Sequence, residues 1–364
     1  MKSIIFHIPF KPNSSVPSGT NIRPLRMLEG FKDLNFDVDV VMGSASERKG
    51  QIKKIKALIK SGKSYEFMYS ESGTLPNLLT ETHHMPTHPF LDFSFFKFCQ
   101  ESKIPIGLFY RDVYWNFDDY KLSGIKAKLT RSMYHLDLRN YEKYLHTLFL
   151  PSLAMERFIP LNKKMNCQAL PSGLQLKKID SKSSSKLTFF YVGGISAMYT
   201  MHELFKAFNK CPEVQLIFCT RKKEWQEQKA SYEKYLGPNI SIHHVSGQAL
   251  DNLMKEADIG LLYFKPNTYR SFAMPVKLFE YLSYDLPIIS STETATGEYI
   301  KNNKLGWLIP YDHYELINLI NLIKNDKELL LKRKEYIKTI KEKHTWQHRA
   351  KEVAEALAPK TSIS

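Results

Sequence analysis

The sequence predicts an α/β fold built from two doubly wound domains, and three observations support this. The chain has 364 residues, which is long for a single hydrophobic core. Short apolar runs alternate with helix-period segments in both halves, a rhythm typical of βαβ units in parallel sheets. A polar, Lys- and Ser-rich stretch at 177–186 interrupts that rhythm, so we place the domain boundary there. The prediction is an N-terminal domain at 1–176 and a C-terminal domain at 177–344.

The first half opens with a predicted βαβ unit. An apolar strand at 3–9 precedes a Pro/Ser/Gly-rich loop at 11–19 and a helix at 21–34, and a second strand follows at 36–42. A long loop after the first strand is expected at the ligand-facing edge of a doubly wound sheet. Further strands are predicted at 65–70, 105–110 and 147–151, with a Phe-rich helix at 89–102 whose phenylalanines we assign to the core, namely Phe90, Phe93, Phe95, Phe96 and Phe98.

The second half repeats the strand–helix rhythm. Residues 287–290 are short, apolar and β-branched, the composition of a strand buried in a parallel sheet. Pro275 is suited to start a helix, because the first helical turn does not need its missing N–H. The remaining strands are predicted at 187–192, 214–219, 240–245, 259–263 and 305–309, the other helices at 202–208, 250–255 and 277–283, and a helical tail at 314–357.

Positive charge is the strongest deviation in composition. A formal net charge of +15 at pH 7 favours partners that carry phosphate. The segment Arg48 to Lys63 has seven basic residues and no acidic one. Such helices either lie on an anionic membrane surface or cover a domain surface as ordinary amphipathic helices, and both readings stay open. The apolar positions of this segment at helical spacing are Ile52, Ile55 and Ile59, and Lys121 to Arg139 repeats the pattern with Lys126, Lys128 and Arg131 among Leu122, Ile125 and Leu129.

Several classes of protein are disfavoured. No apolar run reaches 18 residues, so no membrane-spanning helix is expected. Residues 1–10 contain His7 and Pro9 and lack a small-residue cleavage site, which indicates a first strand rather than a signal peptide. The aromatic residues follow core periods instead of interleaving with basic ones on one surface, so we expect no nucleic-acid partner.

Metal and disulfide chemistry are not expected either. The His83-His84 pair and His88 stand near Pro86 and Pro89 in a loop, and no cluster has the spacing of a metal site. No Asp-x-Asp motif ends a predicted strand. The cysteines form no C-x-x-C pair, and we expect them reduced in the core of a cytoplasmic protein: Cys99, Cys167, Cys211 and Cys219.

One stretch carries a resemblance to a known family. Met274 to Gly306 contains P-x-K-x-x-E-Y-L, then P-I-I-S-S and G-E-Y-I, and G-W follows. This order resembles the donor-binding segment of family 4 glycosyltransferases of the GT-B class. The resemblance implies two Rossmann-like domains facing across a cleft, with the acceptor bound by the first and the donor by the second. Thr345-Trp346 and Arg349-Ala350 resemble the family's closing helix, which implies that residues 345–364 pack back on the first domain.

The resemblance also implies a donor site in the second domain. The glutamate matching Glu280 binds the ribose hydroxyls of a nucleotide sugar in that family, although Lys277 and Glu280 alone would read as a surface ion pair. Gly193 and Gly194 follow a predicted strand, where backbone can approach a pyrophosphate. The family's usual Arg and Lys are not evident there. The positive charge that the leaving diphosphate needs is therefore assigned to Arg221, Lys222, Arg270 and Lys277. The loop near Ser246 is expected to pack on the base.

Acceptor and catalytic groups are expected in the first domain. Arg111 and Asp112 stand at the carboxyl end of a predicted strand, where α/β folds place ligand chemistry. Asp112 is assigned as the acid nearest the acceptor hydroxyl. Many family members have His-Asp here, and the alternative is that Arg111 and Asp112 pair with each other or brace the loop. The acceptor candidates are Gly19, Thr20, Asn21 and Arg23, of which Arg23 can equally be an ordinary helix residue.

The expected reaction is glycosyl transfer from a UDP- or GDP-sugar to a glycan or lipid-linked acceptor, with no cofactor or metal. The resemblance implies retention of the anomeric configuration and a place in cell-envelope polysaccharide or lipopolysaccharide assembly, in the cytoplasm or peripheral on the membrane's cytoplasmic face. The family carries two acids spaced E-x7-E, and the first falls on Phe272. Backbone amides around Ala273 and Met274 are expected to replace it. The alternative is a catalytically silent GT-B subunit that serves as a partner or scaffold.

Overall fold

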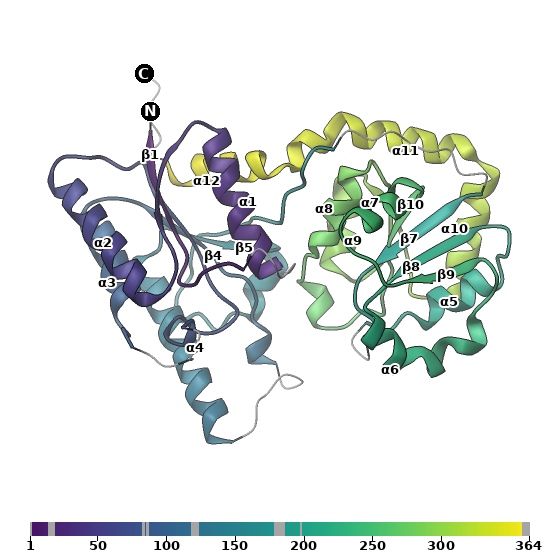
Figure 1. The fold of residues 1–364 in the computed structure, drawn as a ribbon, viewed down its shortest axis with the longest axis horizontal. Coiled ribbons are helices and arrows are strands. Elements are labelled where there is room, and N and C mark those ends of the chain that lie inside the picture. Colours follow the sequence, from purple (N-terminus) through teal and green to yellow (C-terminus); the bar gives the residue numbers. More distant parts are fainter. Residues whose placement is uncertain are drawn as a thin grey trace. The chain divides into compact units, whose positions relative to one another are not determined.

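The computed structural model describes residues 2–13, 19–81, 84, 87–117, 124–177, 186–196 and 199–358. The chain divides into two compact units (Figure 1). Unit 1 comprises Met1–Gly173 and Trp346–Ser364, and unit 2 comprises Leu174–Thr345. The sequence-based boundaries were 176/177 and 344/345; most of the polar stretch that suggested the first of them, and His83 with Pro86, lie outside the described residues.

Unit 1 contains a six-stranded parallel sheet in the order β2-β1-β3-β4-β5-β6. This order extends the 2-1-3-4-5 arrangement of one common doubly wound fold, whose switch point lies between its first and third strands. β6 has only three residues, none of them fully buried, and therefore had no apolar run that could predict it. The strands are β1 Ser3–His7, β2 Asp37–Val41, β3 Met68–Glu71, β4 Ile106–Phe109, β5 Thr147–Leu150 and β6 Cys167–Ala169.

The helices of unit 1 bury one face each against this sheet or against one another. Phe93, Phe95 and Phe96 of α3 are core residues, as predicted, whereas Phe90 precedes the helix and is 73% exposed, so its assignment to the core was wrong. The helices are α1 Gly19–Asp33, α2 Ala45–Lys60, α3 Leu91–Glu101, α4 Ile125–Tyr144 and α12 Trp346–Leu357, with 3₁₀ turns η1 Asn77–Leu79, η2 Tyr114–Asn116 and η4 Leu153–Phe158.

The C-terminal helix completes unit 1. α12 packs along α1 at Gly30, where a Cβ atom would lie 2.7 Å from the carbonyl oxygen of Trp346. Only glycine permits an approach this close. Ala350 and Val353 of α12 are fully buried in the same core as the sheet. Helix α12 is therefore an integral part of the first unit.

Unit 2 contains a second six-stranded parallel sheet, in the order β12-β11-β10-β7-β8-β9. Counted from β7, this is the 3-2-1-4-5-6 order of the Rossmann fold, with the switch point between β7 and β10. Both units are thus doubly wound α/β structures, which confirms the predicted fold class. The strands are β7 Thr188–Val192, β8 Gln215–Cys219, β9 Ile240–His243, β10 Ile259–Leu262, β11 Ile288–Ser291 and β12 Gly306–Ile309.

The predicted helical tail is divided in the structure. Asp326 ends α10 and its side chain caps α11 by accepting the N–H of Leu329. None of the described helices is both long and apolar enough to cross a bilayer. The helices of unit 2 are α5 His202–Asn209, α6 Lys222–Tyr232, α7 Gln248–Lys255, α8 Val276–Ser283, α9 Ala295–Asn302, α10 His313–Asn325 and α11 Lys327–Ile340, with 3₁₀ turns η5 Glu233–Tyr235, η6 Tyr269–Ser271 and η7 Lys341–His344.

Candidate functional site

The switch point of unit 2 is formed by the loops that follow β7 and β10. Ligands of doubly wound folds bind at this place, outside the carboxyl ends of the strands. Gly193 and Gly194 follow β7, and a Cβ atom on Gly193 would lie 2.5 Å from the Tyr191 hydroxyl. That hydroxyl donates to the carbonyl of Gly194 at 2.6 Å. The glycine pair therefore folds back tightly on its own strand, but α5 begins only at His202, so no helix N-terminus follows the glycines directly.

Arg270, in the loop after β10, is a buried cation. Its guanidinium carbon lies 4.2 Å from the ring centroid of Tyr199 and 4.3 Å from that of Phe264. Its Nε and Nη2 atoms find no hydrogen-bond partner among the described residues, although the residue is only 5% exposed. The two rings stabilise the charge in part, but a buried guanidinium without an anion is costly. The geometry leaves this side chain ready to receive a negative group.

Glu280 projects from α8, and its neighbour Tyr281 fixes that helix on the sheet. The Tyr281 hydroxyl accepts the N–H of Val192 at 3.0 Å. Its ring packs directly on Gly260, since a Cβ atom there would lie only 2.5 Å from the ring. The Glu280 side chain is 33% exposed and accepts a hydrogen bond from Lys277 at 2.6 Å. The predicted ion pair is therefore present, at the solvent-accessible side of a rigidly held helix.

The segment before α8 differs from the arrangement expected for it. Phe272, at the position of the family's first acid, is a buried ring packed edge-on against Tyr269 at 5.4 Å. The amide of Ala273 donates to the carbonyl of Tyr269 at 3.0 Å. The expectation that this amide is open to a ligand was wrong, because it closes the preceding turn. Met274, the other residue expected there, is half-buried just ahead of α8.

The remaining candidates of unit 2 lie on exposed loops at the carboxyl edge of β8 and β9. Arg221 precedes α6 and pairs with Glu224, whose carboxylate also accepts the N–H of Ile195 at 3.1 Å. Lys222 is exposed at the start of the same helix. Ser246 is exposed in the loop after β9. The next residue, Gly247, has a φ of +58° and is the last residue before α7. These groups are accessible, and their roles remain predictions.

The corresponding edge of unit 1 is organised by buried polar networks. One joins His7 at the end of β1 to Asp92 of α3, at 2.9 Å through Nε2. The same carboxylate accepts two hydrogen bonds from Arg48, at 2.9 and 3.0 Å. Asp92 and Arg48 are each 3% exposed. Burial raises the pKa of Asp92, but the hydrogen bond from His7 and the charges around it outweigh burial and lower that pKa well below its ordinary value.

Arg48 was predicted to begin a basic helix that either lies on a membrane surface or covers the domain surface, and its buried side chain cannot contribute to either face. Its side chain points inward to close the loops at the end of the sheet, donating also to the carbonyls of Pro9 and Gly43. Ile52 and Ile55 are likewise buried. The outer face of α2 consequently presents lysines without an apolar stripe.

A second network surrounds Glu71, which is the last residue of β3 and is fully buried. Arg23 approaches this carboxylate at 3.3 Å and Arg111 at 3.2 Å. The Tyr69 hydroxyl donates to it at 2.9 Å. The Arg23 guanidinium also stacks 3.5 Å from the Phe109 ring centroid. Arg23 is therefore an interior residue with almost no surface for an acceptor, which corrects its assignment as an acceptor contact.

Asp112 stays at the carboxyl edge of β4, half-buried, while Arg111 turns away to Glu71. The alternative that these two neighbours only pair with each other is therefore not realised. Burial raises the pKa of Asp112 to about 7, against the opposing charge of Arg111. The other acceptor candidates lie at the start of α1 and are partly exposed: Gly19, Thr20, whose hydroxyl is 3.4 Å from that of Thr74, and Asn21, which accepts the N–H of Asn13 at 2.9 Å.

Sequence reasoning missed the carboxylates that organise unit 1. Glu71 stands directly after a predicted strand, which is a signal that could have identified it. Asp92 and Asp137 lie inside helices and gave no such signal. Asp137 accepts the N–H of Asn77 at 2.8 Å, while its Oδ1 has no partner among the described residues. Burial raises its pKa to about 8.

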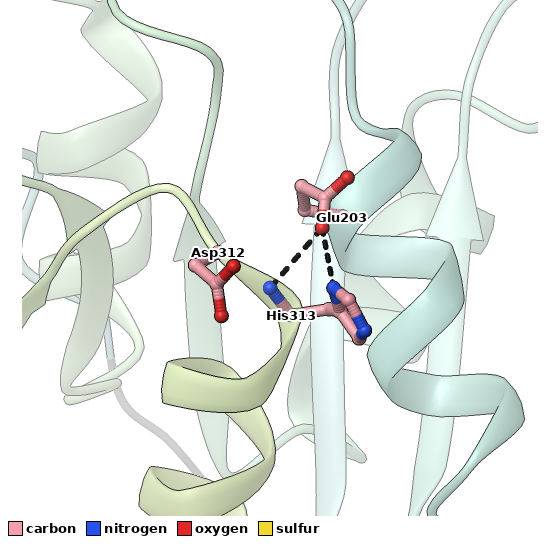
Figure 2. Close-up of side chains that lie close together, drawn as sticks. All are labelled: Glu203, Asp312 and His313. Atoms are coloured by element: carbon pink, nitrogen blue, oxygen red, sulfur yellow. Dashed lines mark hydrogen bonds and ion pairs between the residues drawn. The ribbon is translucent and has the colours of Figure 1, made fainter.

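Three side chains of unit 2 have the composition of a metal site. Glu203 of α5 faces Asp312 and His313 at the start of α10 (Figure 2), and their ligand atoms lie within 4.8 Å of one another. His313 contacts Glu203 through Nδ1 at 2.6 Å and through its amide at 3.2 Å. Asp312 caps α10 by accepting the N–H of Tyr314 at 2.8 Å, and Lys206 holds the other oxygen of Glu203. The polar groups of the cluster are therefore occupied by bonds that hold the start of α10 against α5.

Comparison with known proteins identifies the second unit. Residues 175–342 match the family model "Glycosyl transferases group 1". No curated protein sequence matches the chain. Solved structures with the same fold include Anabaena Alr3699/HepE in complex with UDP, which has 14% identity over 98% of this chain and 99% of that one with a TM-score of 0.64.

Two further structures are similar over the whole chain. One is sucrose-phosphate synthase from Thermosynechococcus elongatus, with 14% identity, 98% of both chains covered and a TM-score of 0.61. The other is WaaG, a glycosyltransferase involved in lipopolysaccharide biosynthesis, with 13% identity, 97% and 99% coverage and a TM-score of 0.56. Unit 2 is therefore a glycosyl transferases group 1 domain, and the chain is a glycosyltransferase with the GT-B fold.

Proposed function

We propose that this glycosyltransferase moves a sugar from a UDP- or GDP-sugar to a glycan or lipid-linked acceptor, with retention, in cell-envelope polysaccharide or lipopolysaccharide assembly. Two similar structures support the substrates: HepE has been solved with UDP and with UDP-glucose, and WaaG acts in lipopolysaccharide biosynthesis. Identity to each is 14% or less, so the argument depends on the residues of this chain.

The observation that carries the proposal is Arg270 in the group 1 domain. Its loop and the Gly193–Gly194 loop follow the two strands of the Rossmann switch point, and Arg270 lacks an anion among the described residues. A nucleotide diphosphate would supply the missing negative charge. Charge-assisted hydrogen bonds from arginine to phosphate are strong and directional. In the transition state, the same contact would stabilise the charge that develops on the leaving diphosphate.

Glu280 is proposed to hold the ribose. A carboxylate accepts hydrogen bonds from two vicinal hydroxyls, and Glu280 is accessible on a helix that Tyr281 locks to the sheet. Lys277 pairs with this carboxylate at 2.6 Å and is itself a candidate for a phosphate contact, with Arg221 and Lys222 as further cations. Ser246 is proposed to face the base. The sugar lacks an acidic partner at Phe272, so the Met274 amide is the remaining backbone candidate in that segment.

Asp112 is proposed as the group nearest the acceptor hydroxyl. A pKa of about 7 suits a carboxylate that takes and returns a proton near neutral pH. Arg111, tied to Glu71, positions the loop on which Asp112 stands. The partly exposed start of α1, with Gly19, Thr20 and Asn21, is proposed to bind the acceptor. The proposal requires no metal or cofactor.

Nucleotide binding tests the proposal directly. Calorimetric titration of the full chain with UDP and with GDP should show saturable binding of one of them. Nucleotide release from a panel of UDP- and GDP-sugars, with and without acceptor glycans, should then identify a donor that turns over. Failure to bind either nucleotide would overturn the proposal.

A second candidate function is a catalytically silent GT-B subunit. The observation that favours it is Phe272, a buried ring at the position where the family has an acid. Such a subunit would still have the fold, and would serve as a partner or scaffold. Nucleotide release separates the two functions, because a silent subunit gives no turnover with any donor sugar.

The proposed place of action is the cytoplasmic face of an anionic membrane. A net charge of +15 draws the chain toward acidic lipid headgroups. The lysines on the outer face of α2, namely Lys49, Lys53, Lys54 and Lys60, would contribute to this attraction through charge alone. A lipid-linked acceptor would be met at the same surface.

A further inference from the structure

Helix α4 of unit 1 has two apolar faces, and only one of them is covered. Tyr134, Leu138 and Tyr141 are buried against the unit. Ile125, Leu129 and Leu136 lie on the opposite side and are 87%, 57% and 38% exposed. Their spacing of four and then seven residues, with Ser132 between them, places all of these positions in one stripe along the helix.

The position of this stripe is unusual for a helix of the domain surface. Single exposed apolar residues are ordinary, whereas a contiguous apolar stripe marks a surface that meets a partner. The first turns of α4 extend away from the sheet of unit 1 (Figure 1), and the buried residues of the helix begin only at Tyr134. Core packing therefore does not account for the apolar residues of its first half.

The charges beside the stripe indicate what this partner is. Residues 125–136 contain no aspartate or glutamate, and Lys126 and Lys128 flank the stripe in exposed positions. Arg139 and Lys143 continue the exposed positive charge along the helix. Among the described residues no side chain caps the N-terminus of α4, and the helix dipole adds partial positive charge at this end.

We infer that the exposed face of α4 docks onto an anionic lipid surface, with the apolar stripe entering the headgroup layer and the lysines contacting lipid phosphates. This arrangement matches that of interfacial amphipathic helices. A second copy of the chain is a poorer occupant, since two faces of equal positive charge repel each other. The inference refines the proposed membrane location and does not depend on the donor chemistry of unit 2.

Vesicle binding of the full chain tests the inference. Flotation with phosphatidylcholine vesicles, with or without phosphatidylglycerol, should show binding only when the anionic lipid is present, and weaker binding at high salt. Replacing both Ile125→Ser and Leu129→Ser should weaken this binding by roughly tenfold or more, because the two residues supply most of the exposed apolar area of the stripe. Ser132→Leu should strengthen it by roughly fivefold.

Two controls make the test specific to α4. Lys126→Glu with Lys128→Glu should weaken vesicle binding by roughly tenfold or more, whereas Lys53→Glu with Lys54→Glu, the same charge change on exposed positions of α2, should weaken it much less. Binding of UDP, or of GDP if that is the nucleotide bound, should be unchanged in every variant, which shows that the chain is folded and separates this test from that of the donor site.

Three outcomes would overturn the inference. The first is that the wild-type chain binds no vesicle at all. The second is that the serine variant and Ser132→Leu bind vesicles as the wild type does while both charge variants lose binding equally, which would make the attraction general rather than a property of α4. The third is that sedimentation without lipid shows dimers of the wild type and monomers of the serine variant, which would assign the stripe to a second copy.

Discussion

The two switch-point edges of this protein place charge in opposite ways. In unit 1, arginines and carboxylates are buried against each other: Arg48 on Asp92, and Arg23 with Arg111 on Glu71. In unit 2, Arg270 is buried without an anion among the described residues, and Glu280 stands at the surface. The charges of the first edge pair with each other and shape its loops, whereas those of the second edge are unpaired among the described residues or accessible to solvent. The same sheet architecture therefore supports an internally braced edge and an open one.

The largest effect is expected from breaking the braced edge. Asp92→Ala would leave His7 without its carboxylate and Arg48 with only the longer contact to Glu81 at 3.6 Å. Removing one partner of a buried ion pair costs about 3–5 kcal/mol of folding free energy. Urea unfolding followed by a probe of unit 1 measures the loss. Asp37→Ala, which removes an exposed partner of Lys63, should cost at most about 1 kcal/mol. Equal losses in the two variants would show that the Asp92 network does not brace the edge.

The next effect concerns the open edge. Glu280→Ala should weaken UDP or GDP binding about 100-fold, since hydrogen bonds to a charged group contribute about 1.5–3 kcal/mol each. Glu335→Ala is a matched control, because Glu335 also pairs with a lysine one helical turn away at 2.7 Å in the same unit. Calorimetry should find the control unchanged. Equal affinity for Glu280→Ala and wild type would remove Glu280 from the donor site.

Arg270 should show opposite effects on binding and on stability. Arg270→Met should weaken nucleotide binding by roughly 10- to 30-fold through the lost phosphate contact. The free energy of unfolding should stay level or rise, because an unpaired buried charge disappears. Arg333→Met, which removes an arginine bonded to the Lys304 carbonyl, controls for loss of positive charge in unit 2. A destabilised variant with normal affinity would make Arg270 a structural residue instead.

The smallest effect is on the pH dependence of stability, and it concerns two acids of unit 1, the buried Asp137 and the half-buried Asp112. Burial raises the pKa of Asp137 to about 8 and that of Asp112 to about 7. The folded state then binds more protons than the unfolded one between pH 4 and 8, so each acid lowers stability as pH rises through this window. Asp137→Asn should therefore stabilise the chain by roughly 1 kcal/mol or more at pH 8, with little gain at pH 4.

Asp112→Asn extends that comparison to activity. It should give a similar pH-dependent gain in stability but reduce sugar transfer, and the rise in rate around pH 7 should disappear. Asp137→Asn should leave transfer unchanged. Loss of transfer in both variants, or in neither, would contradict the proposed role of Asp112. The test is the rate of sugar transfer with the active donor, measured from about pH 5 to 9, a range that spans both pKa values.

Periodicity and local chemistry in the sequence determined the elements. The apolar run at 287–290 became β11, and the helix predicted after Pro275 became α8, since burial of β-branched residues and helix-start preferences are local properties. The Lys277–Glu280 pair followed from helical spacing alone. β6 was missed because three half-exposed residues carry no pattern.

Only the tertiary structure decided which charged residues are buried, and which of these have a partner of opposite charge among the described residues. Arg23, Arg48 and Arg270 all looked like surface cations, and packing buried all three, two with carboxylates and one without. α2 and α4 had the same basic amphipathic pattern, yet α2 buries Ile52 and Ile55 whereas α4 leaves Ile125 and Leu129 exposed. The physical reason is that pairing and burial depend on residues far apart in the chain, such as Arg48 and Asp92, which no local pattern relates.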